Sequence, residues 1–173
     1  MSQALYILMA IGVGVGSAFQ TGMIASLGRA RGPVEAAWIS ILASVAGLAL
    51  FLSVRTLRGN APSLPAPMNG VPFYLAVLLI AGVTLVLAMR DLDFYLAVTG
   101  LFGVIYIASA AFLAPKIGIA LFASAITAGT LFSSLGLDHV GAFGADIRAV
   151  NLIRIMGVAL LFLGVVLVRV ADR

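Results

Sequence analysis

The stretch from residue 114 to residue 144, APKIGIALFASAITAGTLFSSLGLDHVGAFG, decides the fold of this chain. Its middle, residues 119–137, is an uncharged apolar run close to the roughly 20 residues that cross a bilayer as a helix. A short turn, residues 115–118, precedes this run, and a polar turn follows it. Two stripes of small residues recur at helical spacing: Ala120, Ser124 and Ala128, and then Ala125, Gly129 and Ser133. Such stripes let helices approach closely in lipid, so the stretch predicts a packed membrane helix.

The composition extends this prediction to the whole chain. Apolar residues make up 63% of the 173 residues and charged residues only 9%, against about 25% charged residues in soluble domains. Backbone groups inside lipid must be hydrogen-bonded within the segment, and the short alternating segments of a membrane barrel are absent. We therefore predict an all-α, polytopic membrane helix bundle. The chain lacks cysteine, and its ten basic residues are dispersed, which excludes a disulfide framework and gives no sign of nucleic-acid binding.

Apolar runs predict six spans within a single transmembrane domain covering residues 1–173. The spans are expected at about residues 4–27, 33–54, 72–89, 94–114, 119–137 and 152–168, with a proline-rich loop at 59–71. The first run is too long for the apolar part of a cleaved signal, and no Lys or Arg precedes it. Whether residues 72–89 span is the open point of the count, because that segment ends in a very short turn.

Basic residues in the loops do not choose an orientation. The positive-inside rule counts Lys and Arg on each side of the membrane. One side holds Arg55, Arg58, Lys116, Arg169 and Arg173, and the other holds Arg29, Arg31, Arg90, Arg148 and Arg154. This balance leads to the hypothesis that the chain inserts both ways and pairs as an antiparallel dimer. The alternative is that a partner or the first helix sets one orientation.

Polar side chains at membrane depth are costly and tend to face a protein interior or a wet cavity. They concentrate on the first, second, fourth and fifth predicted spans, whereas the third and sixth spans carry almost none. We therefore predict a four-helix inner layer, with the other two spans facing lipid or a dimer partner. The candidate residues for a substrate path are Gln20, Thr21, Ser40, Ser44, Tyr106, Ser109, Ser124 and Thr127. Ser and Thr also bond to their own helix backbone, so a purely structural role stays open for each hydroxyl.

Three ionisable residues are candidates for coupling or gating. Glu35 lies about one turn from the start of its span, where it can partner the helix dipole or a nearby arginine. Asp138 and His139 follow the fifth span, where they can cap the helix and shape the loop, and histidine is the usual side chain of pH switches. The chain has one histidine and no cysteine, so we predict no metal site, no cofactor and no catalytic residue. The absence of a membrane-embedded carboxylate disfavours a proton antiporter for cations.

The loop after the fifth span carries a motif that is similar to a known family. Its residues are Leu137, Asp138, His139, Gly141, Phe143 and Gly144. Further matching positions are Gln20 and Gly22, then Ala114, Pro115, Lys116 and Gly118, and finally Gly157, Leu163, Gly164 and Val165. On these residues the chain resembles the YdcZ-like family of inner-membrane exporters in the drug/metabolite transporter superfamily. The resemblance is expected outside about residues 59–89, and Ile24 and Ser26 depart from the family pattern.

The resemblance implies a multi-pass protein of the bacterial inner membrane that acts as a transporter rather than an enzyme. Family members usually have five spans and occur singly, in pairs or as fused doubles, so residues 72–89 are expected to be an addition. The implied mechanism is alternating access in a homodimer, or in a heterodimer with a related small membrane protein. A path of amide, hydroxyl and aromatic groups suits neutral, zwitterionic or amphipathic small molecules. The rival interpretation is a non-transporting accessory subunit of a larger membrane complex.

Overall fold

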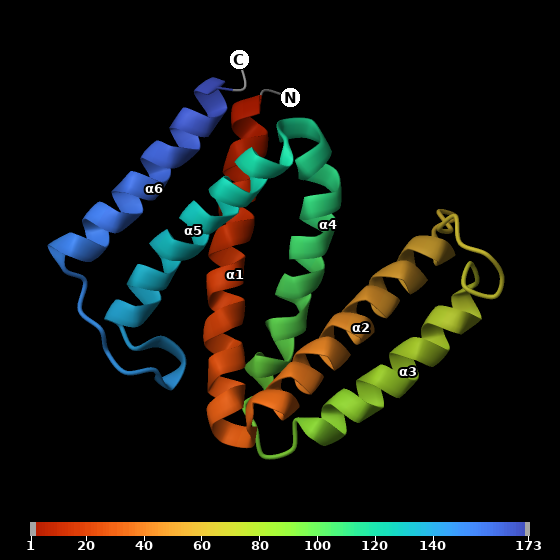
Figure 1. The fold of residues 1–173 in the computed structure, drawn as a ribbon. Coiled ribbons are helices and arrows are strands. Elements are labelled where there is room, and N and C mark those ends of the chain that lie inside the picture. Colours follow the sequence, from red (N-terminus) through yellow and green to blue (C-terminus); the bar gives the residue numbers. More distant parts are fainter. Residues whose placement is uncertain (1–2, 172–173) are drawn as a thin grey trace. The chain divides into compact units, whose positions relative to one another are not determined.

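The computed structural model describes residues 3–171, and the regular elements in that range are helices without any strand (Figure 1). The elements are α1 (Gln3–Arg31), α2 (Pro33–Leu57), α3 (Val71–Ala88), η1 (Phe94–Val98), α4 (Thr99–Ile117), α5 (Ile119–His139), η2 (Ala142–Gly144) and α6 (Leu152–Ala171). When η1 and α4 are taken as one run, residues 3–171 hold six helices long and apolar enough to cross a membrane. The predicted all-α class with six apolar helices is therefore confirmed.

Glycines set the helix ends at two tight connections. Gly32, with φ 103°, separates α1 from α2, and Gly118, with φ 84°, separates α4 from α5. L side chains rarely adopt either conformation. The turn predicted from Pro115 to Gly118 is shorter than expected, because α4 continues through Pro115 to Ile117. Proline removes one hydrogen bond of a helix, but the Gly118 N–H donates to Ala114 O at 2.9 Å and closes the last turn beyond it.

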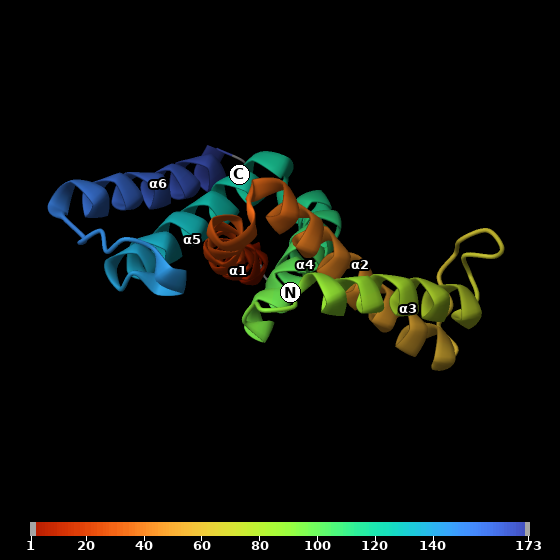
Figure 2. The same ribbon diagram turned by 90° about the horizontal axis from the view of Figure 1, so that it is seen from below.

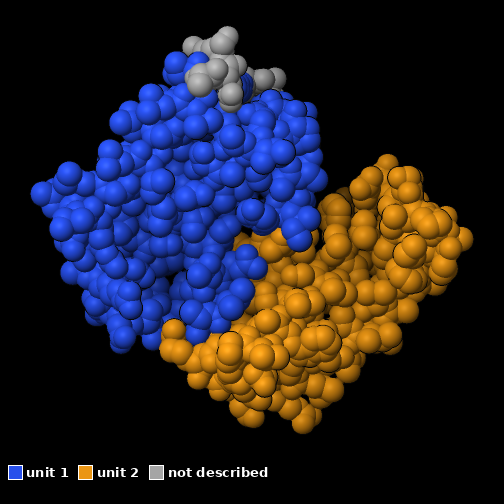
Figure 3. Space-filling model, viewed as in Figure 1, with its two compact units in different colours: residues 1–26, 105–173 blue, residues 27–104 orange. Residues whose placement is uncertain are grey.

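Contacts divide the chain into two compact units (Figure 3). Unit 1 contains residues 1–26 and 105–173, and unit 2 contains residues 27–104. Within unit 1, α5 and α6 lie side by side, and within unit 2, α2 lies beside α3, in both views of the ribbon (Figures 1 and 2). The single transmembrane domain stays a prediction.

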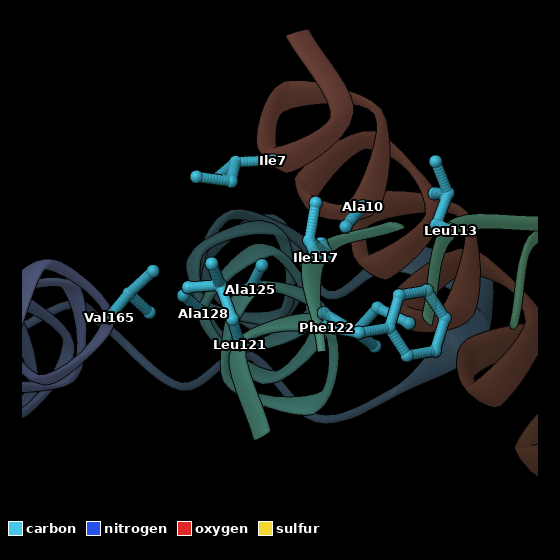
Figure 4. Close-up of a cluster of buried hydrophobic side chains, with 10 residues drawn as sticks. Ile7, Ala10, Leu113, Ile117, Leu121, Phe122, Ala125, Ala128 and Val165 are labelled. Carbon is cyan, nitrogen blue, oxygen red and sulfur yellow. The ribbon is translucent and has the colours of Figure 1, made fainter. Parts of the chain in front are cut away.

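Unit 1 is held together where the backbones of α1 and α5 touch. A Cβ added to Gly14 would lie 2.2 Å from Ile126 O, and one added to Gly129 would lie 2.2 Å from Ile11 O. Both positions therefore require glycine. The side chains that bury around this crossing come from α1, α4, α5 and α6 (Figure 4). They are Ile7, Ala10, Leu113, Ile117, Leu121, Phe122, Ala125, Ile126, Ala128 and Val165.

A hydroxyl group joins the two helices at the same crossing. Thr130 Oγ1 lies 3.0 Å from Gly14 O on α1 and 2.9 Å from Ile126 O on its own helix. The threonine proton can be donated to either carbonyl, so one side chain links the backbones of both helices. Such a bond is available only because the glycines let the helices approach so closely.

Unit 2 repeats this arrangement between α2 and the start of α4. A Cβ added to Gly100 would lie 2.3 Å from Ser44 N and 2.4 Å from Ser40 O. Ser44 Oγ lies 2.8 Å from Gly100 O and 2.9 Å from Ser40 O. A smaller apolar cluster of Leu42, Ala46 and Ala81 packs α2 against α3. Each unit thus contains one glycine crossing with a hydroxyl that reaches across it.

Two helices leave most of their apolar surface open. In their most apolar windows, only 6% of α6 and 11% of α3 are buried, against 39% of α2. The open faces carry large side chains such as Leu79, Ile80, Leu160 and Leu167. This surface requires lipid or another chain to cover it.

Gly129→Ala is expected to destabilise the protein by about 1–3 kcal/mol, the usual cost of an overpacked site. The added methyl group would meet the Ile11 backbone, which cannot swing aside as a side chain can. The free energy of unfolding in detergent micelles measures the effect. Gly12→Ala is the matched control, because nothing lies within 4 Å of its added Cβ. Equal free energies of unfolding for the two variants would contradict the close contact between α1 and α5 at Gly129.

Ser44→Ala is expected to lower the free energy of unfolding by about 0.6 kcal/mol and by no more than about 1.7, the range for hydrogen bonds between membrane helices. The loss comes from the bond to Gly100 O on a neighbouring helix. Ser124→Ala serves as the control, since its hydroxyl donates to Ala120 O within α5. The same unfolding measurement should show a smaller change for Ser124→Ala, and a larger one would refute the assignment.

Candidate substrate-binding site

The largest cavity described in unit 1 is an apolar chamber of about 960 Å³ between α1, α5 and α6. We call it the α1/α5/α6 cavity. It is lined by Leu8, Ile11, Val15 and Phe19 of α1, Phe132 and Ser133 of α5, and Ile155, Ala159 and Phe162 of α6, among others. None of the residues lining it is ionisable. Phe132 and Phe162 face each other edge to face across α5 and α6, with ring centroids 6.3 Å apart.

Two smaller cavities of about 310 Å³ each lie between α5 and α6. One is lined by Asp138 and Arg154 near the loop that joins these helices. The other is lined by Ser124 and Thr127 farther along α5. The helix α6, expected to face lipid or a partner, is therefore a wall of all three cavities. Gly157 and Gly164, seven residues apart on α6, line the two smaller ones.

Polar contacts fix the loop between α5 and α6. Arg154 Nη1 lies 3.4 Å from Asp138 Oδ2 and 3.4 Å from Arg148 O. The Arg148 N–H donates to Asp138 O at 2.9 Å, and the Val150 N–H points at His139 Nδ1 at 3.4 Å. Asp138 and His139, predicted to cap α5 and shape this loop, thus hold its two ends together. Their gating role stays a prediction.

The eight predicted path residues fall into separate places. Ser124 and Thr127 share a small cavity, and their hydroxyls donate to Ala120 O and Ala123 O of their own helix. Ser40 and Ser44 meet at the crossing in unit 2. Ser40 and Ser44 belong to unit 2 and the other six residues to unit 1, and the assignment of the path stays a prediction.

The remaining four path residues lie at different places in unit 1. Thr21 is exposed and donates to Ser17 O within α1, whereas Gln20 and Ser109 are half-buried. The Tyr106 ring lies 6.4 Å from that of Phe122 and is 41% exposed. The prediction made from polar residues did not point to the α1/α5/α6 cavity, because the residues that line this cavity are mainly apolar and aromatic.

Glu35 lies in the first turn of α2, as expected for a partner of the helix dipole. Its carboxylate folds back over Gly32, with Oε2 at 2.6 Å from the Cβ that glycine lacks. The side chain is exposed. Within residues 3–171, no group of three or more His, Cys, Asp or Glu side chains could hold a metal ion.

Comparison with known proteins agrees with this architecture. Residues 63–167 match the family model described as "Putative inner membrane exporter, YdcZ". The expected extent of the resemblance was wrong at α3, because the matched range runs through residues 71–88. It does not include α1 and α2. That α3 is an addition to a five-helix pattern stays a prediction.

No curated protein and no solved structure matches the chain. The family match covers residues 63–167 of 173, and the six apolar helices agree with an inner-membrane location. The chain is therefore a multi-pass membrane protein, and it belongs to the YdcZ family of inner-membrane proteins.

Proposed function

We propose that this chain exports small neutral, zwitterionic or amphipathic molecules and binds them in the α1/α5/α6 cavity. The observation that carries the proposal is the cavity itself, with a volume of about 960 Å³. Small-molecule sites usually measure about 300–1,000 Å³ and combine apolar walls with a few polar groups. Here the walls are aliphatic and aromatic, and Ser133 supplies a hydroxyl group.

The placement of charge supports a substrate without a strong positive charge. Asp138 lines a neighbouring small cavity and is paired with Arg154. Glu35 lies in unit 2, at the first turn of α2. A cation that entered the α1/α5/α6 cavity would meet no carboxylate among its lining residues, and burying an unpaired charge is costly. Export of cations by exchange with protons on a lining carboxylate is therefore disfavoured.

The proposed mechanism is alternating access in a dimer, either antiparallel or paired, formed by two copies or with a related small membrane protein. Two observations support it. Unit 1 leaves the α1/α5/α6 cavity partly open, which leaves room for a partner at its wall. The exposed faces of α3 and α6 offer the apolar surface for such a partner. Catalysis has no part in this mechanism.

The same exposed faces favour one other function, a non-transporting accessory subunit of a larger membrane complex. Purification separates the two. A transporter is expected to purify as a stable dimer of this chain or with a related small membrane protein. An accessory subunit is expected to purify only together with the larger complex.

Counterflow in proteoliposomes tests the transport proposal without requiring knowledge of the energy source. Vesicles preloaded with unlabelled chloramphenicol, a neutral aromatic probe, are expected to accumulate labelled chloramphenicol faster than protein-free vesicles. Ala159→Phe should lower this rate several-fold, because Ala159 lines the cavity and the ring would fill it. Ethidium, a cationic probe, should show little protein-dependent counterflow.

The control for added bulk is Ala108→Phe, at an exposed position of α4. It should retain the counterflow of the unmodified protein. Loss of flux in both variants, or in neither, would contradict the cavity assignment. Gln20→Ala tests the sequence-based path in the same assay, and unchanged flux would remove Gln20 from it.

The balanced loop charges predict dual insertion. A reporter fused to the C-terminus, active on only one side of the membrane, should report both orientations in one population of cells. Adding two lysines to the Pro-rich loop at residues 59–71 should shift the population to one orientation, because it unbalances the five-to-five count. A single strict orientation of the unmodified chain would refute dual topology.

A further inference from the structure

Phe143, in the short helix η2, has a backbone conformation that bulky residues avoid. Its φ is 58° and its ψ is 27°, in the left-handed region that normally favours glycine. Gly141 and Gly144 on either side also have positive φ values, 62° and 72°. The chain thus turns sharply around one large aromatic residue. Outliers of this kind persist only where surrounding contacts over-determine them, and they cluster at clamps and switch regions.

The contacts that hold Phe143 come from α1. A Cβ added to Gly22 would lie 2.5 Å from Cδ2 and 2.9 Å from Cε2 of the Phe143 ring. The absence of a side chain at Gly22 therefore leaves a notch that the ring fills. Phe19, three residues earlier, meets the same ring edge to face with centroids 6.1 Å apart. Phe143 thus packs the loop between α5 and α6 against α1.

The contact between Phe19 and Phe143 adjoins the α1/α5/α6 cavity. Phe19 contacts Phe143 and also lines the cavity. The loop that carries Phe143 leaves the cavity at Leu137 and returns to it at Val150, and both residues are lining residues. At the base of the loop, the Arg148 N–H donates to Asp138 O at 2.9 Å. The loop between residues 138 and 148 is therefore a closed strap with Phe143 on it.

We propose that Phe143 is a latch that closes one end of the α1/α5/α6 cavity, and that withdrawal of its ring from the Gly22 notch opens that end. Release relaxes the left-handed backbone of Phe143 and exposes its ring. The closed state therefore combines a strained backbone with a ring packed in the Gly22 notch, and the open state combines a relaxed backbone with an exposed ring. The identity of the molecules that pass through the opening rests on the proposed function. The closure itself rests only on the contacts of Phe19, Gly22 and Phe143.

The absence of cysteine makes a direct test possible. Ser133→Cys places one thiol in the cavity wall. The full chain is reconstituted in lipid nanodiscs, which leave both membrane faces accessible, and the rate of reaction with a water-soluble maleimide is measured. Gly22→Ala removes the notch, and Phe143→Ala removes the ring. Each, combined with Ser133→Cys, is expected to raise the labelling rate of the introduced thiol several-fold.

Two further variants control the test. Gly12→Ala adds the same methyl group to α1 where nothing lies within 4 Å, and it should leave the labelling rate unchanged. Phe143→Asn removes the ring but keeps a residue that tolerates left-handed backbone, so it should behave as Phe143→Ala does. If Gly22→Ala fails to fold, the two loop variants at Phe143 still decide the question. Equal labelling rates for the parent, Phe143→Ala and Phe143→Asn would overturn the latch.

Labelling and counterflow separate this proposal from the proposed function. Faster labelling in the Phe143 variants without any chloramphenicol counterflow in the parent would support the latch and count against the transport assignment. Chloramphenicol counterflow in the parent, together with equal labelling rates in the parent and the Phe143 variants, would support transport and overturn the latch.

Discussion

Contact between glycine backbones is the constraint on which both units of this protein depend. Lipid removes the hydrophobic driving force between helices, so close packing and hydrogen bonds between helices must hold them together. Gly14 and Gly129 provide the closest approach in unit 1, and Gly100 provides it in unit 2. In each case a hydroxyl on the partner helix reaches a glycine carbonyl, Thr130 in one unit and Ser44 in the other. The two units thus use one solution to the same physical problem.

The crossing in unit 1 and the α1/α5/α6 cavity share a residue. The Ile11 carbonyl lies against Gly129, and the Ile11 side chain lines the cavity. Tight backbone contact at the crossing therefore adjoins a space that large side chains such as Phe132 and Phe162 border but do not fill. A close backbone contact and an open apolar chamber thus lie next to each other on α1.

The sequence predicted the helices well because long apolar runs mark them directly. It ended the first span too early, at about residue 27, because α1 continues through Arg29 to Arg31 before Gly32 interrupts it. It misplaced the end of α4 because Pro115 removes a hydrogen bond without forcing the last turn open. The sorting of spans by polarity gave α6 no part in a path, yet α6 lines all three cavities. Serine and threonine reveal little about a path when their hydroxyls bond to their own helix, as in Ser124 and Thr127. Gly157 and Gly164 each line one of the two smaller cavities, and neither lines the α1/α5/α6 cavity.

The ionisable groups at the ends of α5 and α6 lie apart from the α1/α5/α6 cavity. No ionisable residue lines the α1/α5/α6 cavity, whereas Asp138, His139 and Arg154 gather at the ends of α5 and α6. Asp138 and His139 instead hold the loop between α5 and α6, through the ion pair of Asp138 with Arg154 and the N–H groups of Arg148 and Val150. If the cavity binds substrate as proposed, these groups act on the loop beside it and do not touch the substrate.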